Sequence, residues 1–210
     1  GGGVEGRYPG GIYTLPRRIH TWTLKAGWTA TRATLPAGSR NLVFLYRRPK
    51  ARVFLWGGQD SNGQPHDSRL HVLRFGVWKH PVMSGPRAQF AAVHPEDGAI
   101  ITAVAEDPGS RPVAYAFDLG TWSFRAKGTP MPRPFTLTAV TWAGRRRLYF
   151  GRLPNEGESY CLVAEGSGWR EVPTPGIPGA QEVCMAYDVT RDVAVLYLPV
   201  QQQTWEIRLR

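Results

Sequence analysis

Hydrophobic residues in this chain recur as short apolar runs separated by polar turns, and the pattern repeats four times. Each repeat has one apolar run, a turn of a few polar residues and a second apolar run, at 41–58, 89–107, 137–153 and 182–200. The first runs begin at positions 41, 89, 137 and 182, so their spacings are 48, 48 and 45 residues. Apolar runs joined by turns rich in Pro, Gly, Asp or Arg predict β-hairpins.

A further apolar segment follows each hairpin and leads to a tryptophan, and a related segment precedes the first hairpin. We expect each of these segments to form one strand, followed by a Pro-rich link with room for a fourth, short strand. The C-terminal segment 204–210 has the same character but stops before a tryptophan. The other segments are 18–28, 69–78, 113–122 and 160–169, ending at Trp28, Trp78, Trp122 and Trp169.

Four short strands in each unit of about 45–50 residues are typical of a β-propeller blade. The alternative is a β-sandwich whose strand spacing is accidental. We therefore predict an all-β fold: a small propeller of four or five four-stranded blades, or part of a larger ring. Trp78, Trp122 and Trp169 are then expected to pack between blades. The expected organisation is a flexible Gly-rich leader at 1–10 and a propeller over 11–210, with an extra strand near 18–28 and repeats near 29–78, 79–122, 123–169 and 170–210.

Several short motifs resemble those of kelch repeats, over about residues 11–210. Trp56-Gly57-Gly58 ends a strand as kelch repeats do, the stretch from Phe117-Asp118 to Trp122 is similar to their aromatic-Asp turn before a Trp, and Pro86-Arg87 and Pro132-Arg133 precede the next hairpin. The double glycine occurs in the first unit alone. Kelch rings usually hold six or seven blades, so the resemblance implies about 300 residues for a complete ring. The chain has material for four blades and a fragment.

Composition supports many short strands and adds a strong positive charge. The chain has 210 residues, 24 Gly, 18 Pro and eight Trp, with a formal net charge of +10. Such a charge attracts anionic partners, although a basic surface that is merely solvated gives the same number. No apolar run is long enough for a membrane-spanning helix.

Two of the four predicted hairpin turns carry most of the candidate binding residues. In propellers of the kind this chain resembles, these turns emerge on one face, which often carries the ligand. Guanidinium groups suit carboxylates and phosphates, so we expect this rim to dock an anionic partner; the alternative is that the arginines simply keep the turns soluble. Two tryptophans outside the repeat, Trp56 and Trp142, are candidate surface contacts for sugars or bases. The candidate cations are Arg47, Arg48, Lys50, Arg52, Arg145, Arg146 and Arg147.

Catalytic and metal-binding patterns are weak, and we expect no catalytic residue, metal or cofactor. Cys161 and Cys184 are too few for a disulfide framework or a zinc site, and they form either one bridge or two free thiols. Galactose-oxidase-like copper enzymes share the kelch fold and use Tyr, Cys and His ligands from several blades. Tyr160 and Cys161 are neighbours on one predicted strand, so their side chains point to opposite faces and do not reproduce that cofactor.

These observations favour a non-enzymatic interaction or scaffold module, alone or as a subunit of a larger assembly. Its expected partner is a protein with an acidic or phosphate-bearing surface, and nucleic acid or an acidic glycan is the alternative ligand. Two other functions stay open: a secreted carbohydrate-binding or galactose-oxidase-like protein, and a nucleic-acid-binding subunit of a ribonucleoprotein complex.

Overall fold

The computed structural model describes only part of the chain, and this part contains β-strands and their connections but no helix. That part of the chain therefore contains no helix long and apolar enough to cross a membrane. The fold is all-β, as the sequence predicts. The described residues are 18–23, 25, 27–34, 40–47, 52–59, 70–74, 77–79, 90–94, 99–105, 109–118, 121, 123–126, 130–154, 157–180 and 182–209.

The chain divides into two compact units, residues 1–89 and residues 90–210. The first unit holds an antiparallel pair, β1 and β2, and a four-stranded antiparallel sheet in the order β3-β4-β5-β6. The predicted hairpin at 41–58 is β3–β4. The strands of this unit are β1 (Arg18–Thr23), β2 (Gly27–Thr34), β3 (Arg40–Arg47), β4 (Arg52–Gln59), β5 (Leu70–Arg74) and β6 (Val77–Lys79).

The second unit holds three antiparallel sheets, of which two have four strands and one has three. Their orders are β10-β9-β8-β7, β11-β12-β13-β14 and β15-β16-β17. The strands are β7 (Ala91–Val93), β8 (Ile100–Val104), β9 (Val113–Asp118), β10 (Ser123–Ala126), β11 (Thr136–Ala143), β12 (Arg146–Arg152), β13 (Ser159–Glu165), β14 (Gly168–Val172), β15 (Cys184–Asp188), β16 (Val193–Leu198) and β17 (Gln203–Arg208).

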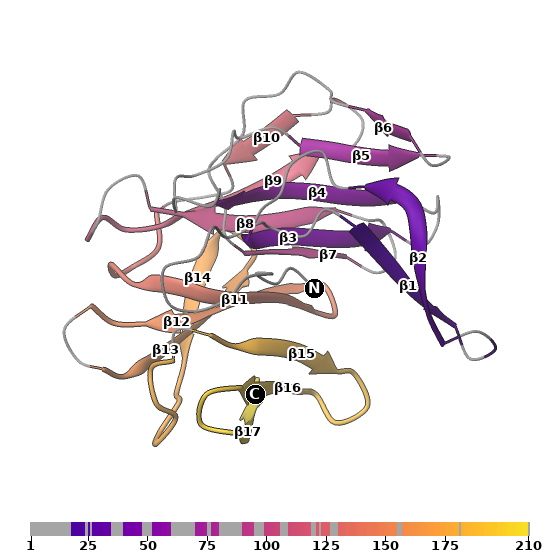
Figure 1. Cartoon of the computed structure of the whole chain (residues 1–210). Helices are drawn as coiled ribbons and strands as arrows, with labels where there is room; N and C mark the ends of the chain where they lie inside the picture. Colours follow the sequence, from indigo (N-terminus) through magenta and orange to yellow (C-terminus); the bar gives the residue numbers. More distant parts are fainter. Residues whose placement is uncertain are drawn as a thin grey trace, which may run out of the picture. The chain divides into compact units, whose positions relative to one another are not determined.

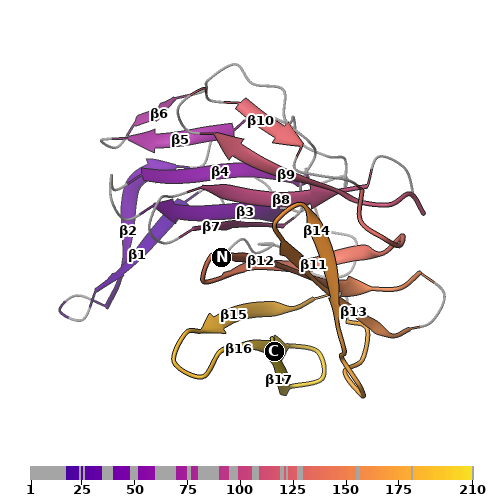
Figure 2. The same cartoon turned by 180° about the vertical axis from the view of Figure 1, so that it is seen from behind.

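The first strands of these three sheets are neighbours. β11 lies beside β7 and also beside β15, and both views show β15 next to the sheet that contains β11 and β12 (Figures 1 and 2). Consecutive meander sheets that stack through their first strands are the arrangement of blades in a β-propeller. The predicted all-β, β-propeller-like fold is therefore confirmed.

The fourth strand of each sheet does not lie in the Pro-rich link, as the sequence had led us to expect. It follows the third strand directly and contains Trp78 in β6 and Trp169 in β14. In the sheet β11–β14 the reversal takes two residues, because Gly166 has a φ of 59° and thus permits a tight turn before Gly168. The segment 18–28 is likewise corrected: it contains β1 and the start of β2 instead of one strand.

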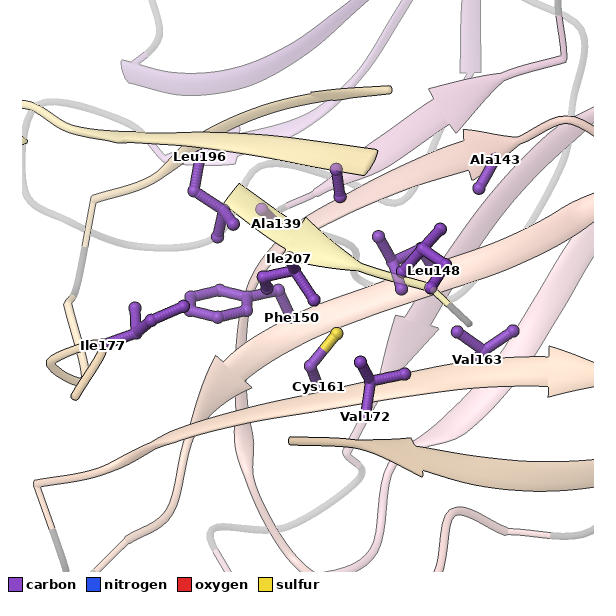
Figure 3. Close-up of a cluster of buried hydrophobic side chains, with 12 residues drawn as sticks. Ala139, Ala143, Leu148, Phe150, Cys161, Val163, Val172, Ile177, Leu196 and Ile207 are labelled. Atoms are coloured by element: carbon purple, nitrogen blue, oxygen red, sulfur yellow. The ribbon is translucent and has the colours of Figure 1, made fainter. Parts of the chain in front are cut away.

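Side chains of the sheet β11–β14 alternate between two hydrophobic clusters, one on each face. Leu148, Phe150 and Cys161 enter the first cluster, where they meet Leu196 and Ile207 of the sheet β15–β17 (Figure 3). The intervening residues enter the second cluster, which also contains side chains of β8 and β9. Because successive strand residues face opposite sides, one sheet fills both clusters. The second cluster includes Ile101, Ala103, Ala114, Tyr149, Tyr160 and Leu162.

Two packing predictions are confirmed by this arrangement. Trp169 packs against the second cluster, with its ring edge-on to Tyr149 at a centroid distance of 5.5 Å. Tyr160 and Cys161 belong to different clusters, so their side chains do lie on opposite faces of β13. The tryptophan of this repeat is therefore partly buried against the second cluster.

Candidate functional site

The β11–β12 turn places its three arginines in three different environments. Ala143 pairs with Arg146, so the turn itself is Gly144-Arg145, with Gly144 at a φ of 61°. Of the three arginines that the sequence placed in this turn, only Arg145 lies in it, because a glycine at the first central position permits a two-residue reversal. Arg146 and Arg147 already belong to β12, so their side chains point to opposite faces of the sheet.

Arg146 is held by an ion pair between two sheets. Its guanidinium binds the carboxylate of Asp192, which ends the β15–β16 turn, and Asp192 also accepts a 2.7 Å hydrogen bond from the Tyr187 hydroxyl. Partial burial is the largest single influence on the pKa of Arg146 and lowers it, but the hydrogen bonds and charges of Asp192 and Tyr187 together outweigh burial and leave the pKa above its ordinary value. The hydrogen bond to Asp192 also raises the pKa of Tyr187. This contact fastens β12 to the sheet β15–β17.

Arg170 lies beside Arg146, although it comes from a different hairpin. The carbonyl oxygen of Leu209 accepts hydrogen bonds from both guanidinium groups, at 3.2 Å from Arg146 and 2.9 Å from Arg170. Arg170 also donates a 2.9 Å hydrogen bond to the carboxylate of Glu165, and this contact lowers the pKa of Glu165. Two guanidinium groups therefore meet at the end of β17.

The charge of Arg145 is not matched within the described part of the chain. It is exposed at the tip of the turn and has no ion pair or hydrogen bond there. Asp192 and Glu165 neutralise the other two guanidinium groups. We call Arg145, Arg146 and Arg170, together with Glu165 and Asp192, the rim cluster. It has one excess positive charge, which suits a carboxylate or phosphate brought from outside.

The remaining residues of this hairpin point away from the rim cluster. Arg147 is half-buried on the face of Tyr149, whose pKa is raised to about 12 by burial and is lowered in part by the charge of Arg147. Trp142 packs half-buried against the second cluster, 4.5 Å from His94 between ring centroids and edge-on to it. The structure therefore does not leave Trp142 free at the surface, where the sequence had placed it as a candidate contact.

The other predicted basic turn lies mostly outside the described residues. Arg47 ends β3 and Arg52 begins β4, and the two pair across the hairpin. Their side chains, those of Arg48 and Lys50, and the side chain of Trp56 in β4 are outside the description. The expectation that this turn and the β11–β12 turn form a single binding rim stays a prediction.

The two cysteines are free thiols with different surroundings. Cys161 is buried in the first cluster, and burial raises its pKa to about 12, whereas Cys184 is exposed on β15. Within the described residues, no three His, Cys, Asp or Glu side chains gather in a way that suits a metal ion. The disulfide bridge that the sequence left open is therefore not formed.

Sequence reasoning missed Arg170 and Asp192, which complete the rim cluster. Gly166-Ser167, between two apolar runs, is a signal for a two-residue hairpin, and it would have brought Arg170 to the same end of the sheet as Gly144-Arg145. Asp192 lay in a predicted turn, but no sequence pattern shows that this turn reaches the neighbouring sheet.

Comparisons with known proteins support the fold and nothing finer. No protein-family model matches the chain, and no curated protein matches it by sequence. Among solved structures, the chain is similar to the structure of YjhT, with a TM-score of 0.61 and 13% sequence identity. The match covers 81% of this chain and 61% of YjhT, so the chain spans less than two thirds of that structure. At this identity the likeness concerns the fold alone.

Proposed function

We propose that the protein is a non-enzymatic interaction module that docks a protein with an acidic or phosphate-bearing surface through basic turns at one end of its sheets. The observation that carries this proposal is the unmatched, exposed guanidinium of Arg145 at the tip of a rigid two-residue turn. Asp192 and Glu165 neutralise Arg146 and Arg170, so the excess positive charge of the rim cluster is that of Arg145. A fixed turn loses little conformational freedom on binding, which favours recognition of an anionic group.

The rim cluster changes the expected role of the neighbouring arginines. Arg146 binds Asp192 and the Leu209 carbonyl, so it positions the rim and supports the sheet contact more than it offers a free charge. Replacing all three turn arginines together would therefore mix loss of stability with loss of binding. Arg145 alone is the residue whose substitution separates the two.

We also propose that the fold is a divergent kelch-type β-propeller. Gly151 pairs with Leu137 as Gly57 pairs with Leu42, so the glycine that ends the second strand of a kelch hairpin is retained in both sheets. The guanidinium of Arg133, from the Pro-Arg motif, lies 5.7 Å from the centre of the Tyr160 ring. The fold likeness to YjhT supports the same assignment.

The test uses a fluorescent poly-glutamate chain as a probe of acidic surfaces, measured by anisotropy at moderate salt. We expect binding by the wild-type chain, and a loss of affinity of about fivefold or more for Arg145→Glu, because one attractive charge becomes repulsive. Arg111→Glu is the matched control, since Arg111 is also exposed and lies outside the rim cluster. The control should bind as the wild type does, and all three chains should melt at the same temperature.

Two results would contradict the proposal. Equal affinities of wild type, Arg145→Glu and Arg111→Glu would show that binding follows the overall charge and not the rim. Preferential binding of a single-stranded oligonucleotide, with an affinity that falls steeply with salt, would instead favour the nucleic-acid alternative.

A further inference from the structure

One row of side chains crosses the sheet β11–β14 beside the β11–β12 turn, on the face that joins the second cluster. Residues paired across neighbouring strands share one face, so the pairing register defines the row. It has a tryptophan at each end and a methyl group next to an arginine. The second cluster is built within residues 90–210, so this row belongs to one compact unit. The row is Trp142-Arg147-Ala164-Trp169.

Two hydrogen-bond donors at this row have no partner within the described part of the chain. They are the indole Nε1 of Trp142 and the hydroxyl of Tyr149, and both atoms are buried. Tyr149 comes two residues after Arg147 in β12, so it lies on the same face in the next row. Burial raises the pKa of Tyr149 to about 12, so the hydroxyl keeps its proton at neutral pH. Because buried donors are costly to leave unsatisfied, two of them side by side point to an acceptor that comes from outside the chain.

Arg147 adds a positive charge to these two donors. It is half-buried, and no carboxylate of the described residues pairs with it. Glu171 lies on this face two strands from Tyr149, but it binds Arg133 instead, at 3.9 Å. One guanidinium beside two neutral donors matches one unit of negative charge on an acceptor with several lone pairs. A carboxylate has this chemistry, whereas a phosphate dianion would keep a charge unmatched.

We propose that Trp142, Arg147 and Tyr149 bind the carboxylate group of a small molecule. Arg147 pairs with the charge, and the indole N–H and the phenol O–H donate hydrogen bonds to the carboxylate oxygens. The rings at the two ends of the row favour a ligand with an apolar body. Because Arg147 and Arg146 point to opposite faces of the sheet, this site is separate from the rim cluster and independent of the docking proposed above.

The first experiment follows the indole N–H signals of the full chain by ¹H–¹⁵N NMR during titration with sodium benzoate. The variants Trp142→Phe and Trp205→Phe identify two of the eight signals. The Trp142 signal should shift downfield and saturate as its hydrogen bond forms. The Trp205 signal should stay in place, because that indole already donates to Gln203 at 3.2 Å in another sheet. No saturable shift at Trp142, an equal shift with sodium chloride, or tighter binding of inorganic phosphate than of benzoate overturns the proposal.

The second experiment measures the benzoate affinity of variants by the same titration. Arg147→Gln should weaken binding by about tenfold or more, because the charge-assisted hydrogen bond is lost. Arg145→Gln removes the same charge two residues away, outside this row, and should bind as the wild type does. Tyr149→Phe keeps the ring against Trp169 and removes only the hydroxyl, so it should weaken binding by about fivefold without lowering the melting temperature. Equal effects of Arg147→Gln and Arg145→Gln, or an unchanged affinity of Tyr149→Phe, overturn the proposal.

Discussion

The sheets β11–β14 and β15–β17 are neighbours with a shared cluster, but matched side chains of their central strands differ in exposure. The sheet β11–β14 sends Leu148 and Phe150 to one side and Tyr149 to the other, and all three are fully buried. The sheet β15–β17 buries Leu196 on one side and leaves Tyr197 exposed on the other. Phe150 of β12 and Tyr197 of β16 are both aromatic residues of a central strand, but only Phe150 is buried by a neighbouring sheet.

The same alternation of aliphatic and aromatic residues therefore contributes differently to stability in the two sheets. Where a second sheet covers a face, the pattern stabilises the fold by burying apolar area. Where the side chain stays exposed, as at Tyr197, the same pattern contributes less to stability. Substitutions at matched positions in the two sheets measure this difference.

The largest effect is expected for Phe150→Ala. The Phe150 side chain is fully buried in the first cluster, so truncation removes its packing and leaves a cavity, at a cost of about 3–5 kcal/mol in the free energy of unfolding. The matched variant Tyr197→Ala, at a side chain that is 43% exposed, should cost less than about 1 kcal/mol. Denaturant unfolding of dilute protein, followed by tryptophan fluorescence, measures both. Similar losses for both variants would show that the Tyr197 side chain is covered in solution.

A second contrast concerns two glycines within the sheet β11–β14. A Cβ at Gly151 would lie 2.1 Å from the carbonyl oxygen of Thr136 and 2.6 Å from Phe135, so Gly151→Ala forces the backbone apart. Such overpacking costs about 1–3 kcal/mol. At Gly168 the nearest atom to an added Cβ is 3.7 Å away, so Gly168→Ala should leave the unfolding midpoint almost unchanged. Equal midpoints for the two variants would mean that Phe135 and Thr136 move away from position 151 without loss of stability.

The variant Asp192→Asn tests how much the ion pair between Arg146 and Asp192 stabilises the contact between the two sheets. Asparagine tolerates the positive φ of 52° at this position but removes the charge that binds Arg146. Because the pair is about one third exposed, the loss should be about 1 kcal/mol. Thermal unfolding at low and high salt is the measurement. A variant as stable as the wild type at low salt would show that the first cluster alone holds the sheets together.

The smallest effect is expected in the pH dependence of the exposed carboxylates. Hydrogen bonds from Arg170 and Arg191 lower the pKa of Glu165 and of Asp188, respectively. A lowered pKa stabilises the fold above the carboxyl's ordinary pKa, and this contribution is lost as the pH falls through the pKa of the folded state. Glu165→Gln and Asp188→Asn should each flatten the acid side of a plot of melting temperature against pH. A slope unchanged in both variants would contradict these pKa directions.

The fold was predictable from the sequence because its hairpins depend on the local alternation of apolar runs and polar turns. The hairpins at 137–153 and 182–200 became β11–β12 and β15–β16. The position of the fourth strand was not predictable in this way, since the apolar segment that leads to Trp169 predicts one strand, whereas the chain reverses within it at Gly166-Ser167. Short turns that depend on one glycine are weak signals beside long apolar runs.

The sequence predicts the turn that carries Arg145, but it does not predict which other residues join it in the rim cluster. Arg145 was identified because it lies in a polar reversal between two apolar runs. The pairing of Arg146 with Asp192 joins residues 46 positions apart through the stacking of two sheets. The convergence of Arg146 and Arg170 on the Leu209 carbonyl likewise depends on where β17 ends. Contacts of this kind depend on how the sheets stack, and one chain's residue pattern does not contain that information.

The alternation of side chains along β12 and β13 also limits how the length of this protein changes in evolution. Tyr160 and Cys161 belong to different clusters, and so do Tyr149 and Phe150. Gaining or losing a single residue inside either strand would exchange the contents of both clusters at once, with every later side chain on the wrong side. Natural insertions and deletions are therefore expected in the turns.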